Sequence, residues 1–162
     1  MGRTVTFKGN TMHLVGDEVK VGDKAPMASV TTPDFQPLKA EEFAGKVVLI
    51  SVTPSLDTGV CDAQARRFNQ EAASLSDDVR VVNVSLDLPP ALKRWCAANG
   101  IENVSVVSDY QDREFGQRYG LLIDELKLLA RAVFVIDRDG TVVYREIVPE
   151  VTDSPDFDAA LE

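Results

Sequence analysis

The stretch that decides the fold is residues 47–61, VVLISVTPSLDTGVC. Its first part, 47–53, is a nearly continuous apolar and β-branched run, which is typical of a strand buried on both faces of a sheet. Pro54 ends this run, and from Cys61 onward the spacing becomes helical. The apolar residues there recur at three- and four-residue steps: Cys61, Ala65, Phe68, Ala72 and Leu75. A buried strand that leads through a short loop into an amphipathic helix indicates an α/β protein.

Working outward, strands and helices alternate along the chain. The pattern predicts strands over 79–86 and 104–108 and helices over 89–99 and 112–119. Two hairpins enclose this region, and they span 4–15, around Gly9-Asn10, and 132–148, around Arg138-Asp139-Gly140. Three shorter elements are also expected: a strand over 28–32, a helical turn over 38–43, and a last helix capped by Ser154.

This order of elements predicts an α/β protein with a mixed central sheet, flanking helices and an N-terminal β-hairpin, and it is compatible with a thioredoxin-like fold. The alternating part supplies parallel strands, and the terminal hairpin adds antiparallel ones. The order alone is also compatible with other α/β folds. The chain has 162 residues and neither repeat nor linker, so residues 1–162 are expected to form a single domain.

Composition narrows the class of function. There are 17 basic and 26 acidic residues, and the net charge is −9. A nucleic-acid binder would show a basic surplus, so that class is excluded, as is docking on an anionic membrane. The longest apolar run, 47–52, is too short to span a bilayer. The N-terminus lacks a signal peptide, and a cytoplasmic location is expected.

Few residues could carry chemistry. Two cysteines and a single histidine, His13, are too few for a disulfide scaffold and poor material for a zinc site. No phosphate-binding glycine loop is present, and neither a metal nor a cofactor is expected. His13 lies in the first hairpin, far in sequence from both cysteines, so a Cys–His hydrolase is unsupported.

Cys61 is the first candidate. It falls in the first turn of its helix, beyond the carboxyl end of the most apolar strand, where open α/β sheets bind ligands. Unpaired backbone N–H groups and the helix dipole favour a thiolate there. Cys61 also lies on an apolar stripe with Ala65 and Phe68, and free cysteines are often buried. Position alone fits a reactive thiol and a core cysteine equally.

Cys96 and Arg131 are the other candidates. Cys96 shares a helical face with Leu92 and Trp95, which favours a core cysteine when it is considered alone. Arg131 directly precedes the apolar run 132–136. It is either an arginine whose stem is buried at a strand end or a fixed cation that stabilises a thiolate and an oxyanion. The cysteines are 35 positions apart, and the absence of a Cys-x-x-Cys motif argues against a thioredoxin-type reductase.

Pro54-x-x-x-Thr58-x-x-Cys61 resembles the active-site signature of the peroxiredoxins. The full string 54–61, PSLDTGVC, is similar to the thiol peroxidase (Tpx) subfamily in particular. Further matches lie at 68–70, 95–96 and 130–133, and the opening hairpin is typical of that subfamily. The resemblance covers nearly the whole chain. Thr53 departs from it by replacing a bulky apolar residue, and Trp95 stands where phenylalanine is more common.

The resemblance implies an atypical 2-Cys peroxidase that reduces hydrogen peroxide and organic hydroperoxides. Cys61 would be the peroxidatic thiolate and Cys96 the resolving thiol, and thioredoxin would reduce the Cys61–Cys96 disulfide. The donors to the two peroxide oxygens would be the Thr58 hydroxyl, the backbone N–H groups of Val60 and Cys61, and the Arg131 guanidinium, with Pro54 shaping the pocket. A homodimer is implied as well.

A disulfide requires the two Cα atoms to lie within about 7 Å. Because Cys61 and Cys96 belong to different helices, both helices are expected to unwind in part during each cycle. Two other functions stay open at this point. A non-catalytic interaction domain would bury both thiols, and they would ignore peroxide and alkylating agents. A redox sensor would use the same residues but pass its disulfide to a partner protein.

Overall fold

The fold is described from a computed structural model of the chain. The structure describes residues 4–16, 18–25, 30–38, 46–55, 63–68, 79–99, 105–111, 113–150 and 155.

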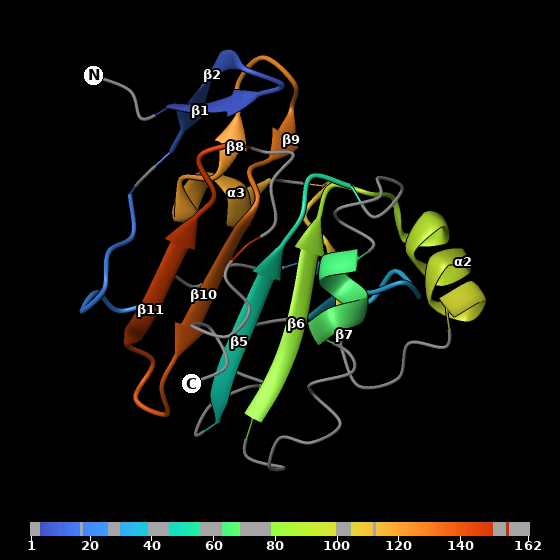
Figure 1. The fold of residues 1–162 in the computed structure, drawn as a ribbon. Coiled ribbons are helices and arrows are strands. Elements are labelled where there is room, and N and C mark those ends of the chain that lie inside the picture. Colours follow the sequence, from blue (N-terminus) through green and yellow to red (C-terminus); the bar gives the residue numbers. More distant parts are fainter. Residues whose placement is uncertain are drawn as a thin grey trace.

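A seven-stranded mixed sheet forms the centre of the molecule (Figure 1). Its strands are β3 (Val30–Thr31), β4 (Pro37–Leu38), β5 (Val47–Val52), β6 (Val79–Ser85), β7 (Ser105–Ser108), β10 (Ala132–Ile136) and β11 (Val142–Ile147). Their order is β11-β10-β5-β6-β7-β3-β4. β5, β6 and β7 pair in parallel, and the other neighbours pair antiparallel. The predicted mixed sheet is therefore confirmed.

A second, smaller antiparallel sheet has the order β1-β2-β8-β9. Its strands are β1 (Thr4–Phe7), β2 (Asn10–Val15), β8 (Leu122–Ile123) and β9 (Leu128–Leu129). β1 and β2 form the predicted N-terminal hairpin, whose turn residues Lys8 and Gly9 both have positive φ. β8 and β9 were not predicted, because strands of two residues show no periodicity. This small sheet has its own apolar cluster, which includes Val5, Leu14, Ile123 and Ala130.

In the part of the chain that the structure describes, two helices and one further helical segment pack on the central sheet. α2 (Pro89–Asn99) begins and ends where the sequence predicts. α3 (Glu114–Tyr119) ends at Gly120, which has a φ of 67° and donates its backbone N–H to the carbonyl of Gly116. Residues 63–68 form the described part of the helix predicted from 61 onward. Within the described part of the chain, no helix is long and apolar enough to cross a membrane.

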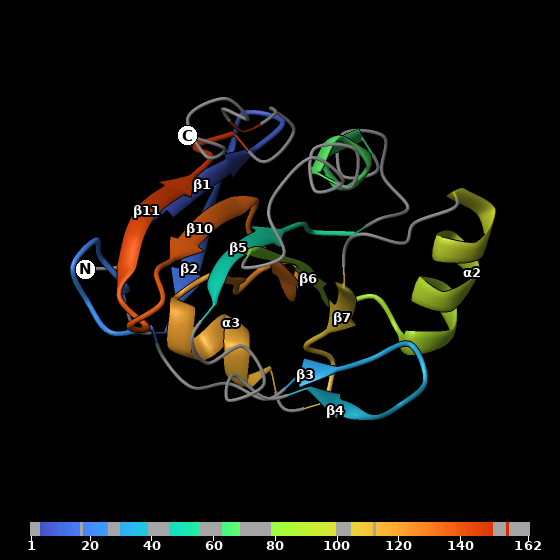
Figure 2. The same ribbon diagram turned by 90° about the horizontal axis from the view of Figure 1, so that it is seen from below.

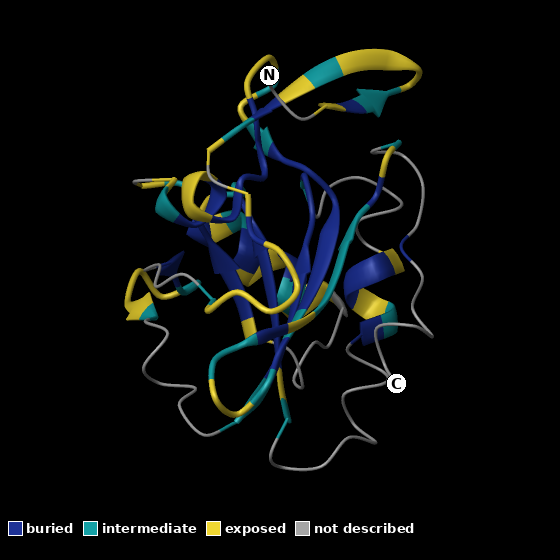
Figure 3. Cartoon of the chain, turned by 90° about the vertical axis from the view of Figure 1, so that its left-hand side faces the viewer, coloured by how far each residue is buried: buried dark blue, intermediate teal, exposed yellow. Residues whose placement is uncertain are grey.

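The helices divide between the two faces of the central sheet (Figure 2). On one face, Phe115 and Tyr119 of α3 belong to a large apolar cluster with alternate residues of β5, β6 and β10. On the other face, Leu92 and Trp95 of α2 and Phe68 of segment 63–68 share a second cluster, which we call the α2-face cluster. Its other buried members are Leu49, Ala65, Val81, Val106 and Val133. The central strands are buried, whereas the N-terminal hairpin is more exposed (Figure 3).

One prediction near the start of the sheet was wrong. Leu38 belongs to strand β4 and pairs with Val30 of β3, whereas the sequence predicted a helical turn from this residue. The cause is a tight turn directly after β3, in which Thr32 donates its N–H to the Gln36 carbonyl and so returns the chain as a hairpin. The rest of that predicted turn, 39–43, and the helix expected after Ser154 lie outside the described residues.

Candidate active site

The structure describes three of the predicted site residues, Pro54, Cys96 and Arg131. Cys61, Thr58 and Val60 lie outside the described residues. The surroundings of the site can still be built from the strand that leads into 56–62 and from the helical segment that follows it.

The pairing of β10 with β5 fixes the position of Arg131. β10 runs antiparallel to β5 with Ala132 opposite Val52, so Arg131 lies at the carboxyl end of β5, where that strand leads into Pro54. Both Pro54 and Arg131 are buried, and Arg131 is only 2% exposed. Arg131 is thus a buried cation at the end of the strand that leads towards Cys61.

Gln64 holds this cation, and sequence reasoning missed it. Arg131 donates from Nη1 to Gln64 Oε1 at 2.8 Å. The Gln64 side chain, itself fully buried, donates from Nε2 to Ser51 Oγ at 2.7 Å and to the Val52 carbonyl at 3.3 Å. One amide therefore connects β5, segment 63–68 and the start of β10. The available signal was a polar residue one helical turn after Cys61.

The sheet face under this contact changes from apolar to polar along the strands. Successive residues of a strand alternate between faces, so the side chains at 49 and 51 of β5 and at 53, directly after it, share one face, as do those at 81, 83 and 85 of β6. The first residue of each set belongs to the α2-face cluster. The later ones are polar and fully buried: Ser51, Thr53, Asn83 and Ser85. Arg131, directly before β10, continues this polar end of the face.

Thr53, a departure from the subfamily pattern, has a role in this polar end. Its Oγ1 accepts a hydrogen bond from Asn83 Nδ2 at 3.2 Å, and its backbone N–H donates to the Val84 carbonyl. A bulky apolar side chain would leave the buried Asn83 amide without this acceptor, which is costly. Among the described residues, Asn83 Oδ1 has no hydrogen-bond partner.

Cys96 lies on the same face of the sheet. It is a half-buried free thiol of α2 that packs against the α2-face cluster, which also contains Ala65 and Phe68 of segment 63–68. Burial raises the pKa of the Cys96 thiol, so this thiol is protonated near neutral pH. The helix that follows Cys61 in the sequence and the helix that carries Cys96 therefore share one apolar cluster.

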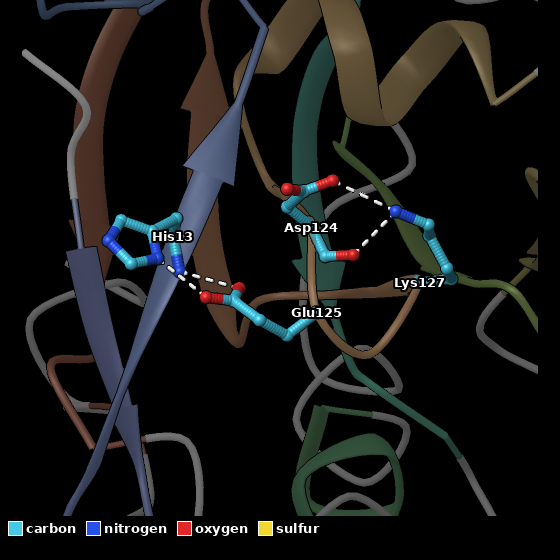
Figure 4. Close-up of polar contacts among 4 residues, drawn as sticks. All are labelled: His13, Asp124, Glu125 and Lys127. Carbon is cyan, nitrogen blue, oxygen red and sulfur yellow. Dashed lines mark hydrogen bonds and ion pairs between the residues drawn. The ribbon is translucent and has the colours of Figure 1, made fainter.

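His13 is engaged elsewhere. Its backbone N–H and its Nδ1 both contact the carboxylate of Glu125, which lies between β8 and β9 (Figure 4). These hydrogen bonds lower the pKa of Glu125 to about 2. In the same turn, Lys127 contacts Asp124. His13 is thus part of the exposed surface of the small sheet.

Comparison with known proteins identifies the family. A family model described as Redoxin matches residues 20–161. The "Thiol peroxidase" of Halalkalibacterium halodurans is 56% identical over 159 residues, covering 98% of this chain and 95% of that protein. The "Thiol peroxidase" of Bacillus subtilis is 53% identical, covering 98% and 94%. The chain belongs to the redoxin family, within the thiol peroxidases. The resemblance found in the sequence is therefore confirmed.

Solved structures agree with this fold. The "peroxiredoxin-like protein from Aquifex aeolicus" superimposes on this chain with a TM-score of 0.92. The two sequences are 45% identical, and the match covers 99% of this chain and 95% of that one. The "Thiol peroxidase from Chromobacterium violaceum" gives 0.86 at 24% identity, covering 96% and 91%. At that identity the second match shows the fold alone. The predicted thioredoxin-like architecture is confirmed.

Proposed function

We propose that this thiol peroxidase reduces hydrogen peroxide and organic hydroperoxides at the sulfur of Cys61. The observation that carries the proposal is the buried Arg131 guanidinium, which Gln64 holds at the carboxyl end of β5. That strand leads through PSLDTGVC to Cys61. A fixed cation at this point favours a thiolate, and it also stabilises the negative charge that develops on the leaving oxygen.

The first step is the oxidation of Cys61. Its thiolate attacks one peroxide oxygen, an S–O bond forms, and the O–O bond breaks. Sulfur supplies the electron pair, and the second oxygen leaves as hydroxide or alkoxide and takes up a proton. Cys61 becomes a sulfenic acid. In this step the Thr58 hydroxyl, the Val60 and Cys61 backbone N–H groups and Arg131 act as donors to the peroxide oxygens, and Pro54 excludes water.

The second step joins the two thiols. The Cys96 sulfur displaces the hydroxyl group of the Cys61 sulfenic acid, which releases water and leaves a disulfide. Two observations support Cys96: it lies on the same sheet face as segment 63–68, and its thiol is free in the structure. Because Cys96 packs in the α2-face cluster, we infer that α2 must loosen before the sulfurs meet.

The remaining parts of the proposal come from the family. Thioredoxin, by thiol–disulfide exchange through a mixed disulfide, returns both cysteines to thiols. The enzyme works as a homodimer in the cytoplasm, a compartment that keeps thiols reduced.

The decisive experiment is intact-mass analysis after one equivalent of hydrogen peroxide. We expect wild-type protein to lose two hydrogens, Cys96→Ser to gain one oxygen, and Cys61→Ser to keep its mass. With thioredoxin and its reductase, wild-type protein turns over and Cys96→Ser turns over poorly. Normal turnover by Cys96→Ser would remove Cys96 from the cycle. An unchanged wild-type mass would favour the non-catalytic interaction domain.

A further inference from the structure

Asp87 connects the two segments that lead to the cysteines. Its Oδ1 accepts a hydrogen bond from Ser55 Oγ at 2.7 Å, and its Oδ2 accepts one from Ser85 Oγ at 2.9 Å. Its backbone N–H also donates to Ser85 Oγ at 3.3 Å. Ser55 follows strand β5, whereas Ser85 ends strand β6. One half-buried carboxylate therefore binds both chain segments as they leave the sheet.

Each of these segments leads directly to one thiol. Ser55 stands six positions before Cys61, and Asp87 stands two positions before α2, the helix that contains Cys96. The start of α2 is fixed at this point, because the Leu88 carbonyl accepts the backbone N–H groups of Ala91 and Leu92. A shift of either segment away from the sheet must stretch or break the Ser55–Asp87 contact.

The base of this contact is rigid. Ser85 is fully buried and pairs with Ser108 of β7, and its carbonyl accepts the backbone N–H of Asp109. Asp87 is therefore tied to the buried end of the sheet, while Ser55 stands at the start of the segment that leads to Cys61. Hydrogen bonds to an ionised carboxylate are stronger than those between neutral groups.

We propose that Asp87 is a positioning residue that holds the Cys61 segment against the entrance of α2 and so opposes disulfide formation. The proposal rests on the proposed function, because it assumes the Cys61–Cys96 disulfide. With the Ser55–Asp87 contact made, Ser55 is held at the carboxyl end of β5, the end at which Arg131 lies, which suits peroxide reduction. With the contact broken, the two thiols approach more readily. Asp87 thereby sets how long the sulfenic acid of Cys61 persists.

That lifetime determines a competition between two products. The sulfenic acid either condenses with Cys96, releasing water, or meets a second peroxide, which transfers an oxygen to sulfur and leaves as water or alcohol. The second route gives a sulfinic acid. The ratio of disulfide to sulfinic acid is a property of each folded molecule, so a simple loss of folded protein leaves it unchanged.

The experiment compares Asp87→Ala and Ser55→Ala with wild-type protein. Reduced protein is mixed with hydrogen peroxide over a range of concentrations, and disulfide and sulfinic acid are counted by mass spectrometry after rapid quenching. The fluorescence of Trp95, the only tryptophan and the neighbour of Cys96, gives the rate of disulfide formation. Losing one charge-assisted hydrogen bond at a half-buried site should speed this step about fivefold to tenfold. The peroxide concentration that gives equal products should rise by the same factor.

Asp137→Ala is the matched control. The Asp137 carboxylate also accepts two hydrogen bonds, from the backbone N–H groups of Asp139 and Thr141, both at 3.0 Å. It lies at the other end of the sheet, because Ile136 of β10 pairs with Val48 near the start of β5. Asp137→Ala should therefore lower stability without moving the product ratio.

The outcomes separate the two proposals. A wild-type protein that forms no Cys61–Cys96 disulfide defeats the proposed function. A normal wild-type disulfide with an unchanged product ratio in both Asp87→Ala and Ser55→Ala defeats the role of Asp87 alone. More sulfinic acid in Asp87→Ala would show that Asp87 assists disulfide formation, which also overturns the proposal. If the product ratio shifts in Asp87→Ala but not in Ser55→Ala, Asp87 does not act through its contact with Ser55.

Discussion

At the scale of single residues, a buried amide contributes to the environment of Arg131. Gln64 accepts the guanidinium N–H through a neutral oxygen, so this contact orients the cation without cancelling its charge. The same amide is held from behind by Ser51, a fully buried hydroxyl of β5. Because buried polar groups are costly when unpaired, these three side chains must be considered together.

We predict that Gln64→Leu slows the reaction of the reduced enzyme with peroxide by about tenfold to a hundredfold, because Arg131 loses its hydrogen bond to the Gln64 amide oxygen. The pKa of Cys61 should rise at the same time. Stopped-flow kinetics across a pH series measures both effects. Gln64→Glu keeps an acceptor for Arg131 but adds a negative charge beside the cation and loses the donor to Ser51 and the Val52 carbonyl, so it should not recover the wild-type rate. If Gln64→Leu reacts at the wild-type rate, the orientation of Arg131 does not depend on this amide.

At the scale of elements, Asp109 controls the start of α3 in a pH-dependent way. Its carboxylate accepts the backbone N–H groups of Phe115 and Gly116 at 3.0 and 2.7 Å. Burial raises the pKa of Asp109 to about 6, although these hydrogen bonds act in the opposite direction. A carboxyl group whose pKa is higher in the folded state adds stability at low pH, and this stability is lost as the pH rises through about 6.

We therefore predict that Asp109→Asn destabilises the protein more at pH 4.5 than at pH 7. The shift corresponds to an extra loss of about 2 kcal/mol in the free energy of unfolding at the lower pH. Urea denaturation of both proteins at the two pH values measures the difference, in which the other titrating groups cancel. An equal destabilisation at both pH values would show that Asp109 has an ordinary pKa in the folded state.

The close approach of Gly16, which follows β2, to the backbone of α3 gives a second prediction at this scale. Gly16 has a φ of +103°, and a Cβ atom there would overlap the backbone oxygen of Gln117. Gly9, in the β1–β2 turn, also has a positive φ, but its Cβ atom would meet nothing within 4 Å. Gly9→Ala should cost about 1–2 kcal/mol of unfolding free energy from backbone strain alone.

Gly16→Ala should cost clearly more than Gly9→Ala, because the small sheet must shift away from α3 to admit the methyl group. Thermal unfolding of the two variants makes the comparison. Equal losses in both would mean that the backbone around Gln117 gives way without cost. Since both glycines lie in or beside the N-terminal hairpin, the comparison isolates the contact with α3.

At the scale of the whole molecule, the sequence pattern predicted those strands, helices and turns that are determined by residues close together in the chain. The apolar run of β5, the start of α2 at Pro89 and the turn at Gly140 each have a strong local signal, and each was confirmed. The contact between Gln64 and Arg131 joins residues 67 positions apart, and the contact between Ser55 and Asp87 joins residues 32 apart. Contacts between residues so far apart in the sequence cannot be predicted from a local pattern. Family resemblance supplied Arg131 but neither of the side chains that hold the site.

The two faces of the sheet should respond differently to oxidation. Cys96 packs against the α2-face cluster, and under the proposed function α2 loosens before Cys96 joins Cys61 in a disulfide. The cluster around α3 lies on the other face and keeps its contacts. We predict that the oxidised protein exchanges amide hydrogens faster in 63–68 and 89–99 but not in 114–119.

The thermal stability of the oxidised protein should change as well. Although a cross-link usually stabilises a protein, here the loss of packing should outweigh that stabilisation, and the oxidised form should unfold at a lower temperature. Hydrogen-exchange mass spectrometry and calorimetry of both redox forms test this, and equal protection of α2 in the two forms would mean that the thiols meet without any loosening.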